Sequence, residues 1–333
     1  MNLSISSQSR KFLCNCFFAA GFLFVCSPTA VHSQSQQTPS TPPRPSGQPK
    51  ISVKTELVVL PVSVTDANGN VVLGLTQQNF RVYEDGRHQD ITLFQQGDTP
   101  VTVGLIVDHS RSMGPKLEEV AAAVSAFARS SNPHDEMFVV DFNDDVTVEL
   151  MNGKPFTHDP KELEKAIGAV RARGRTALYD AVAEGLIHLE LGHSERKALI
   201  IVSDGGDNAS RQKFSQLLDQ ARQSQVLIYS IGLIGGDGES DPAVLRHLAK
   251  ATGAIAYFPD AANSVMNVST QIARDLREQY TLGFVPAKAD KPHAFRKIEV
   301  KVDAPGHAKI RVRSRAGYSA ADEKSAQASS GVK

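Results

Sequence analysis

Between residues 100 and 277, short apolar runs alternate with longer stretches that have the periodicity of amphipathic helices. The runs typical of buried strands are residues 103–107, 137–142, 198–202, 226–231 and 254–258, with a more polar run at residues 146–150. The helical stretches between them are residues 116–129, 160–171, 177–191, 212–223, 242–250 and 261–277. Continuous apolar strands separated by helices indicate a parallel sheet that is covered on both faces. We therefore predict an α/β fold with a doubly wound, mainly parallel six-stranded sheet.

The two ends of the chain, outside this α/β region, show the alternation of apolar and polar residues that is typical of β-strands. The pattern predicts two N-terminal hairpins and three C-terminal strands, at residues 55–65 with 70–75, 80–83 with 91–94, 281–285, 297–303 and 309–313. Each group alone would be marginally stable and would leave strand edges unpaired. We therefore expect both chain ends to build one small antiparallel β module, in which the alternating Arg311, Arg313 and Arg315 form a solvated face.

The first 33 residues resemble an export signal. Arg10 and Lys11 precede an apolar run, residues 12–26, that is too short for a comfortable membrane span. Val31 and Ser33 suit a cleavage site, so we expect a mature chain that begins near residue 34. Lipidation at Cys26 is the alternative, and a membrane association would follow only from an uncleaved or lipidated signal.

These patterns divide the chain into six parts: a signal peptide (1–33), a linker with five prolines (34–50), an N-terminal β segment (51–98), the α/β domain (99–278), a C-terminal β segment (279–318) and a disordered tail (319–333).

Composition excludes several functions. The 333 residues contain 36 basic and 36 acidic side chains, which argues against a nucleic-acid binder, since such proteins usually carry a basic excess. All three cysteines, at positions 14, 16 and 26, precede the expected cleavage site. A mature chain would therefore have neither disulfides nor thiolate metal ligands. The ten histidines are scattered without a metal-ligand spacing, and we expect them to be exposed.

Polar residues follow two of the predicted strands. Asp108, Ser110 and Ser112 alternate directly after the first strand, Asp204 follows the strand at residues 198–202, and Thr176 precedes a helix. Ligands of doubly wound sheets bind outside the carboxyl ends of the strands. Oxygen ligands with few charges suit magnesium, which keeps several of its waters.

This pattern, Asp108-x-Ser110-x-Ser112 with Thr176 and Asp204, resembles the metal-ion-dependent adhesion site of von Willebrand factor type A domains over about residues 102–277. The resemblance implies that Ser110, Ser112 and Thr176 ligate the metal directly or through water. It also implies that Asp108 and Asp204 act mostly through water and that a partner carboxylate takes one position. The flanking β segments resemble exported bacterial proteins grouped as von Willebrand factor type A-related, best represented in Acidobacteria.

We therefore expect a non-enzymatic binding protein located in the periplasm, at the cell surface or outside the cell. Its cofactor would be Mg²⁺, with Mn²⁺ or Ca²⁺ as alternatives, and it would need no small-molecule cofactor. Its partner would be a protein that offers an Asp or Glu carboxylate, not a nucleic acid. One alternative is a metal-dependent hydrolase or a subunit of an enzyme complex, but Asp180 and Asp207, the acidic residues near in sequence, fit helix-start and loop roles better than that of a general base. The other alternative is a structural envelope component with an unused metal site. We also expect Asp108→Ala to remove the metal without unfolding the domain, because a strand-end carboxylate would make no core contact.

Overall fold

The computed structural model describes residues 57–149, 153–168, 170–235, 240–260, 262–286 and 295–319. The predicted signal peptide, the predicted linker and the tail beyond Ser319 lie outside the described residues. All described residues belong to one unit, which begins at Lys54. Among them, no helix combines the length and the apolar character that crossing a membrane requires.

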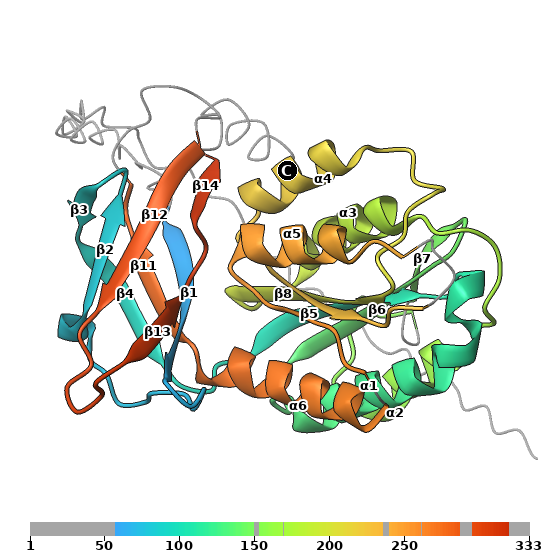
Figure 1. The fold of residues 1–333 in the computed structure, drawn as a ribbon, viewed down its shortest axis with the longest axis horizontal. Coiled ribbons are helices and arrows are strands. Elements are labelled where there is room, and N and C mark those ends of the chain that lie inside the picture. The colour runs from blue at the N-terminus through green and yellow to red at the C-terminus, as the bar shows by residue number, and fades with distance from the viewer. Residues whose placement is uncertain are drawn as a thin grey trace, which may run out of the picture. The chain divides into compact units, whose positions relative to one another are not determined.

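A six-stranded sheet forms the centre of the α/β region (Figure 1). Its strands are β5 (Val101–Asp108), β6 (Glu136–Phe142), β7 (Val146–Glu149), β8 (Arg196–Ser203), β9 (Leu227–Gly232) and β10 (Ala256–Tyr257). They lie in the order β10-β9-β8-β5-β6-β7, and only β7 is antiparallel to its neighbour. The predicted doubly wound, mainly parallel six-stranded sheet is thus confirmed.

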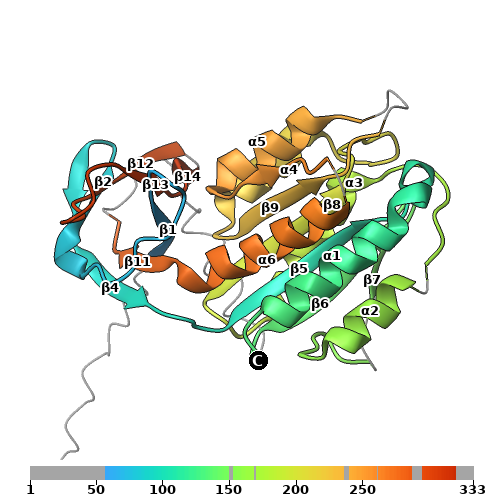
Figure 2. The ribbon, with the colours of Figure 1, turned by 60° about the horizontal axis from the view of Figure 1, so that its bottom comes forward.

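Three helices cover each face of this sheet (Figures 1 and 2). One face carries α1 (Leu117–Ser130), α2 (Pro160–Gly168) and α6 (Ala262–Glu278), and the other carries α3 (Leu178–His188), α4 (Phe214–Gln223) and α5 (Pro242–Thr252). Short 3-10 helices are η1 (Gln77–Asn79), η2 (Arg111–Lys116) and η3 (Leu189–Leu191). Alternate residues of β5 enter two separate cores, with Leu105 in one and Ile106 in the other. Both faces of the central strands are therefore buried, as their continuous apolar sequences require.

Local sequence sets the ends of α5. Asp241 caps its first turn by accepting a hydrogen bond from the Ala243 amide at 3.0 Å, and Pro242 occupies the first helical position, where its missing N–H costs nothing. Gly253 ends the helix with φ +84°, a backbone conformation that favours glycine.

The two chain ends form a second region made of two four-stranded antiparallel sheets. The strands are β1 (Val58–Asp66), β2 (Phe80–Glu84), β3 (Arg87–Gln89), β4 (Ile91–Gln96), β11 (Tyr280–Phe284), β12 (Phe295–Val302), β13 (Ile310–Arg313) and β14 (Gly317–Ser319). Their orders are β13-β1-β11-β4 and β14-β12-β2-β3, so every neighbour of β1 comes from the other chain end. The expectation of one antiparallel β module built from both ends is confirmed, and we call this region the β module.

The predicted hairpins are partly wrong. Residues 70–75 form no strand and contribute only an isolated bridge between Thr65 and Val71. Asp85 and Gly86 both have positive φ, at 47° and 79°, and they fold residues 87–89 back onto β2. Because this short strand occupies the edge beside β2, the next strand, β4, joins β11 in the other sheet.

The predicted solvated face of arginines is also wrong. Arg315 is only 3% exposed and donates to the main-chain oxygens of Arg222 and Ser224, each at 2.8 Å. Burial lowers the pKa of Arg315 to about 10. Arg313 donates to Ser63 Oγ and Gly253 O, each at 2.8 Å, and pairs with Asp275 of α6. Of the three arginines only Arg311 is exposed. The other two join the β module to the α/β region.

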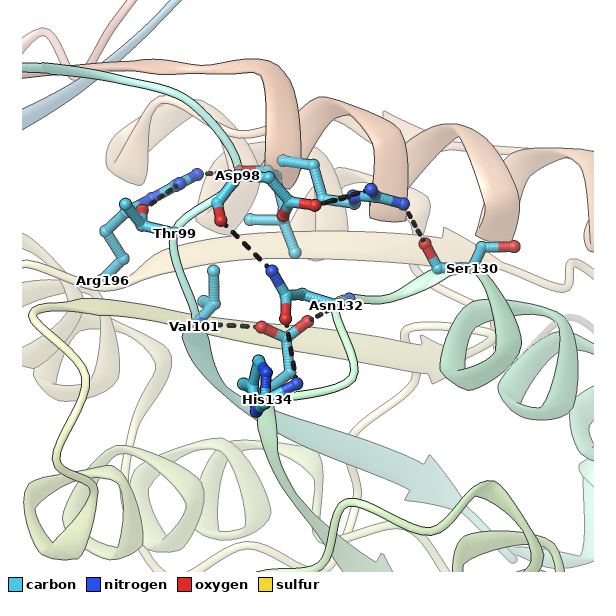
Figure 3. A network of polar contacts seen from close by, with 10 residues as sticks. Asp98, Thr99, Val101, Ser130, Asn132, His134 and Arg196 are labelled. Atoms are coloured by element: carbon cyan, nitrogen blue, oxygen red, sulfur yellow. Dashed lines mark hydrogen bonds and ion pairs between the residues drawn. The ribbon is translucent and has the colours of Figure 1, made fainter.

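A second polar network lies where the chain passes from β4 into β5 (Figure 3). The Asp135 carboxylate accepts hydrogen bonds from the Val101 and Asn132 amides, and Asn132 Nδ2 donates to Asp98 O. Arg277 of α6 pairs with the Asp98 carboxylate at 2.6 Å. The β module is therefore attached at the amino end of β5, which leaves the carboxyl end free.

We predict that Arg313→Ala lowers the free energy of unfolding by about 3 kcal/mol, because it leaves the mostly buried Asp275 carboxylate without its cation. Arg311→Ala removes an exposed arginine from the same strand and should change stability by less than about 0.5 kcal/mol. Urea unfolding of both variants measures the difference. Equal midpoints for the two variants would contradict the role of Arg313.

Candidate metal centre

The sequence-predicted site residues come together at the carboxyl edge of the central sheet. β5 and β8 are parallel neighbours in a register that pairs Val107 with Val202, so the two chains leave the sheet side by side. After β5 the chain enters α1 on one face, whereas after β8 it enters α4 on the other. This divergence opens a crevice between the two loops, which is where doubly wound folds bind their ligands.

Asp108 is held in one position at the centre of the site by burial and by hydrogen bonds. Its side chain is completely buried, Oδ1 accepts from the Ser110 amide at 2.8 Å, and Oδ2 accepts from Ser203 Oγ at 2.6 Å. Burial raises the pKa of Asp108 to about 6, although hydrogen bonds from Ser110 and Ser203 act in the opposite direction, and the nearby Asp204 carboxylate raises it further.

The hydroxyls lie beside these carboxylates. Ser112 Oγ donates to Asp204 Oδ2 at 2.8 Å, and the Ser110 and Ser112 hydroxyl oxygens are 3.2 Å apart. Thr176 is held from the opposite loop, where its amide donates to Asn208 Oδ1 at 2.9 Å and its carbonyl accepts from the Asn208 amide at 2.9 Å. A cavity of about 270 Å³ is lined by Ser112, Thr176, Asp204, Gly206, Asp207 and Asn208.

The charges of this site fit a cation. Asp108 and Asp204 are both about 1% exposed or less, and among the described residues neither forms an ion pair with a Lys, Arg or His side chain. Two buried carboxylates without a counter-charge are costly unless a cation balances them. Three hydroxyls stand next to them, and hydroxyl and carboxylate oxygens are the ligands that magnesium prefers. The residues present therefore suit a hard divalent cation.

This donor set is unusual in having few acidic groups. No cluster of three or more His, Cys, Asp or Glu side chains suited to a metal ion occurs in the part of the chain that the structure describes. The predicted ligand set has two carboxylates, Asp108 and Asp204, and three neutral hydroxyls, while the Asp207 carboxyl group also lines the cavity. A cation bound here would keep part of its positive charge, which would attract a further anionic ligand.

His109 departs from the expected exposure of the histidines. It is completely buried, and its Nδ1 atom lies 2.8 Å from Oδ1 of the buried Asp141. Its amide donates to Phe142 O at 2.8 Å, and its carbonyl accepts from the Arg173 amide at 2.9 Å. Burial raises the pKa of the Asp141 carboxyl. His109 thus anchors the loop between Asp108 and Ser110 to β6.

Sequence reasoning missed three residues that hold the site in place. Ser203 donates to Asp108, and Asn208 fixes both sides of the Thr176 main chain. Gly205 has φ +87°, and a Cβ at this position would lie 2.3 Å from Asp241 O. All three occur in the run Ser203-Asp204-Gly205-Gly206-Asp207-Asn208. The density of turn-forming residues in this run was the available signal that its main chain is specifically folded.

The expectation that Asp108 makes no core contact is wrong. Replacing it with Ala would leave the Ser110 amide and the Ser203 hydroxyl without their acceptor, at a cost of about 1–3 kcal/mol for each buried donor. Asp204→Asn keeps the side-chain volume and is the better probe of the metal.

Two larger hollows lie elsewhere, along α6. One of about 970 Å³ is lined by residues that include Thr65, Tyr257 and Arg274, and one of about 510 Å³ is lined by residues that include Asp98 and Arg277. Neither contains any of the five sequence-predicted site residues. Two of the carboxylates that line them, Asp275 and Asp98, are paired with arginines.

Comparison with known proteins agrees with this geometry. The family profile of the von Willebrand factor type A domain matches residues 103–271, and the chain belongs to this family. An uncharacterised protein of Synechocystis sp. is 22% identical over 169 residues, which are 50% of this chain and 39% of that protein. The chain thus matches about two fifths of the length of this relative.

Solved structures with similar folds come from several bacteria. A von Willebrand factor type A protein from Catenulispora acidiphila is 12% identical, with a TM-score of 0.48 over 82% of this chain and 76% of that one. An aerotolerance-related membrane protein from Bacteroides fragilis is 16% identical, with a TM-score of 0.44 over 52% of this chain and 98% of that one. The von Willebrand factor domain of a type V pilus tip protein from Porphyromonas gingivalis is 13% identical, with a TM-score of 0.43 over 59% and 100%.

We predict that Asp204→Asn weakens magnesium binding by about tenfold or more, since it removes one of two carboxylate charges and about 1.4 kcal/mol corresponds to a factor of ten. Ser112→Ala should weaken it less, because it removes a neutral oxygen. Asp145→Asn removes an exposed carboxylate from a neighbouring loop and is the matched control. Titration calorimetry with magnesium chloride measures all three. Identical affinities for Asp204→Asn and Asp145→Asn would place the metal elsewhere.

Proposed function

We propose that this chain is an exported, non-enzymatic binding protein whose von Willebrand factor type A domain recognises a protein partner through a divalent cation. Ser110, Ser112 and Thr176 would hold the cation, and Asp108 and Asp204 would act mostly through bound water. An Asp or Glu carboxylate of the partner would complete the metal shell. Mg²⁺ is the proposed ion, with Mn²⁺ or Ca²⁺ as alternatives.

The observation that carries this proposal is the pair of buried carboxylates without a counter-cation at the end of the sheet. The three hydroxyls beside them add no charge. When bound, the cation supplies an electrophilic centre that is only partly neutralised and attracts an anionic ligand. The chain's own residues hold the loops that carry the hydroxyls: the Ser110 amide donates to Asp108, and Asn208 holds the Thr176 main chain.

Thr176 supports this role from the opposite loop. Its side chain is 6% exposed and lines the cavity, and its hydroxyl makes no hydrogen bond to another described residue. A hydroxyl in this position is free to ligate a cation, whereas its main chain is fully used in holding the loop.

The two candidate bases of a hydrolase are used in other ways. The Asp180 carboxylate accepts from the amides of Arg211 and Gln212, at 2.9 and 3.2 Å. Asp207 Oδ1 accepts from the Tyr179 amide at 3.1 Å and from Ser210 Oγ at 2.5 Å. Both carboxylates therefore help to hold the loop against the start of α3.

Export is supported by the N-terminal sequence. The basic start, the apolar run and the confinement of all cysteines to the first 26 residues suit a chain that works outside the cytoplasm. The periplasm, the cell surface and the extracellular space are all compatible with the proposed binding role.

The proposal predicts metal-dependent capture of a partner. The immobilised chain should retain a protein from the envelope or secreted fraction of its host in magnesium and release it when EDTA removes the metal. Asp204→Asn should capture little of it, whereas Asp145→Asn should capture as much as the unaltered chain. Quantitative mass spectrometry of the eluates measures the difference.

Two outcomes would contradict the proposal. Capture that persists in EDTA and in Asp204→Asn would show that recognition does not use the metal. Magnesium-dependent hydrolysis of ester, phosphate or peptide substrates that is lost in Asp204→Asn would favour an enzyme.

A further inference from the structure

Four exposed arginines lie close in sequence to the candidate metal ligands. Arg111 lies between Ser110 and Ser112, and Arg171, Arg173 and Arg175 alternate along the segment that leads to Thr176. The residues between the last three, Ala172 and Gly174, are less exposed. The chain thus presents a charged side chain to solvent at every second position of this segment.

Most of these charges are unpaired. Arg175 pairs with Asp144 at 2.8 Å, but the side chains of Arg111, Arg171 and Arg173 form no ion pair or hydrogen bond with another described residue. A second exposed acidic side chain of the β6–β7 turn is Asp145, and it makes no ion pair with them. Three cationic groups therefore face solvent, and of the two exposed carboxylates in the β6–β7 turn only Asp144 is paired with an arginine, Arg175.

The main chain fixes these arginines beside the metal ligands. The Arg173 amide donates to His109 O at 2.9 Å, and the Arg111 amide donates to Gly174 O at 3.3 Å. These bonds join the arginine segment to the loop that carries Asp108, Ser110 and Ser112. Arg111 and Arg175 are each one residue, about 3.8 Å of chain, from a candidate ligand. The main chains of Arg111 and Arg173 are thus held in the loops of the candidate ligands, and exposed charges act on an anion over about 8 Å, the Debye length at physiological salt.

Arg111, Arg171, Arg173 and Arg175, which we call the cationic rim, form a local basic group in a chain whose 36 basic and 36 acidic residues balance. A single carboxylate would satisfy the open metal position but would leave the three arginines unused. Arginine forks match carboxylates in geometry, and their charges would repel a partner with basic residues around its metal-binding carboxylate.

We propose that the partner segment bound at this site is an acidic protein segment with several Asp or Glu residues, of which one binds the metal and the others pair with Arg111, Arg171 and Arg173. This inference rests on the proposed function, because the metal-bound carboxylate sets the register of the segment. The inference adds that the charges flanking the metal-bound carboxylate determine which partner the site selects. A protein segment is favoured over a nucleic acid because the chain as a whole carries no basic excess, with 36 basic and 36 acidic residues.

Binding of two peptides tests the inference. Fluorescently labelled hexaglutamate and a labelled, end-blocked Gly-Glu-Gly peptide are titrated with the full chain in magnesium and in EDTA, with fluorescence anisotropy as the readout. Hexaglutamate should bind at least about tenfold more tightly than the single-carboxylate peptide, and only in magnesium. Its affinity should fall more steeply with added sodium chloride, because the flanking pairs are exposed.

The test variant is Arg171→Gln with Arg173→Gln. The matched control is Arg81→Gln with Arg311→Gln, which removes two exposed arginines of the β module and changes net charge equally. The test variant should bind hexaglutamate about three- to tenfold more weakly, since each exposed ion pair contributes modestly. Its magnesium affinity, measured by calorimetry, should rise slightly because nearby positive charge is lost. If the substitutions only damaged the loop, the affinities for hexaglutamate and for magnesium would both fall.

The outcomes separate this inference from the proposed function. If the single-carboxylate peptide binds in magnesium but hexaglutamate binds no better, or if test and control variants behave alike, the inference is overturned and the metal-dependent function stands. If magnesium itself fails to bind, both are overturned. Equal affinity for a six-nucleotide oligothymidylate in magnesium would make the rim a general polyanion site and would also overturn the assignment to an acidic protein segment.

Discussion

The placement of two carboxylates at the ends of adjacent parallel strands is the constraint on which the site depends. The register of β5 and β8 brings Asp108 and Asp204 to the same edge of the sheet, where both are buried. Burial raises the pKa of Asp108 to about 6, and repulsion by the nearby Asp204 carboxylate adds to this rise. A bound cation would remove the repulsion. The surrounding loops, with their hydroxyls and their Gly205 turn, are built around the space that such a cation would occupy.

The remainder of the fold keeps this edge of the sheet open. The β module is attached through the β4–β5 connection and through α6, which continues directly into β11. Arg313 and Arg315 fix it to α6 and to the end of α4 with contacts that are mostly buried. These attachments lie toward the amino end of β5, so the module leaves the loops at the carboxyl end free for a partner.

The fold was largely predictable because buried parallel strands need apolar residues on both faces, a pattern that is visible in residues 103–107 and 198–202 without knowledge of their partners. The site followed from the same logic, because polar residues directly after such strands must meet at one edge. The pairing of β4 with β11, in a different sheet from β2, was not predictable, since local turn chemistry does not determine which sheet a strand joins. His109 and Arg315 were missed because their burial depends on groups far away in the sequence, Asp141 and the main chain at Arg222 and Ser224.

Anomalous diffraction from crystals soaked in manganese chloride would locate the cation, because manganese replaces magnesium at oxygen sites and scatters anomalously. We expect one strong peak enclosed by the Ser110, Ser112 and Thr176 hydroxyls, and its loss in crystals of Asp204→Asn. A peak at another place in the chain, or no peak here at saturating manganese with Asp108 and Asp204 unmoved, would show that these residues do not form a metal site.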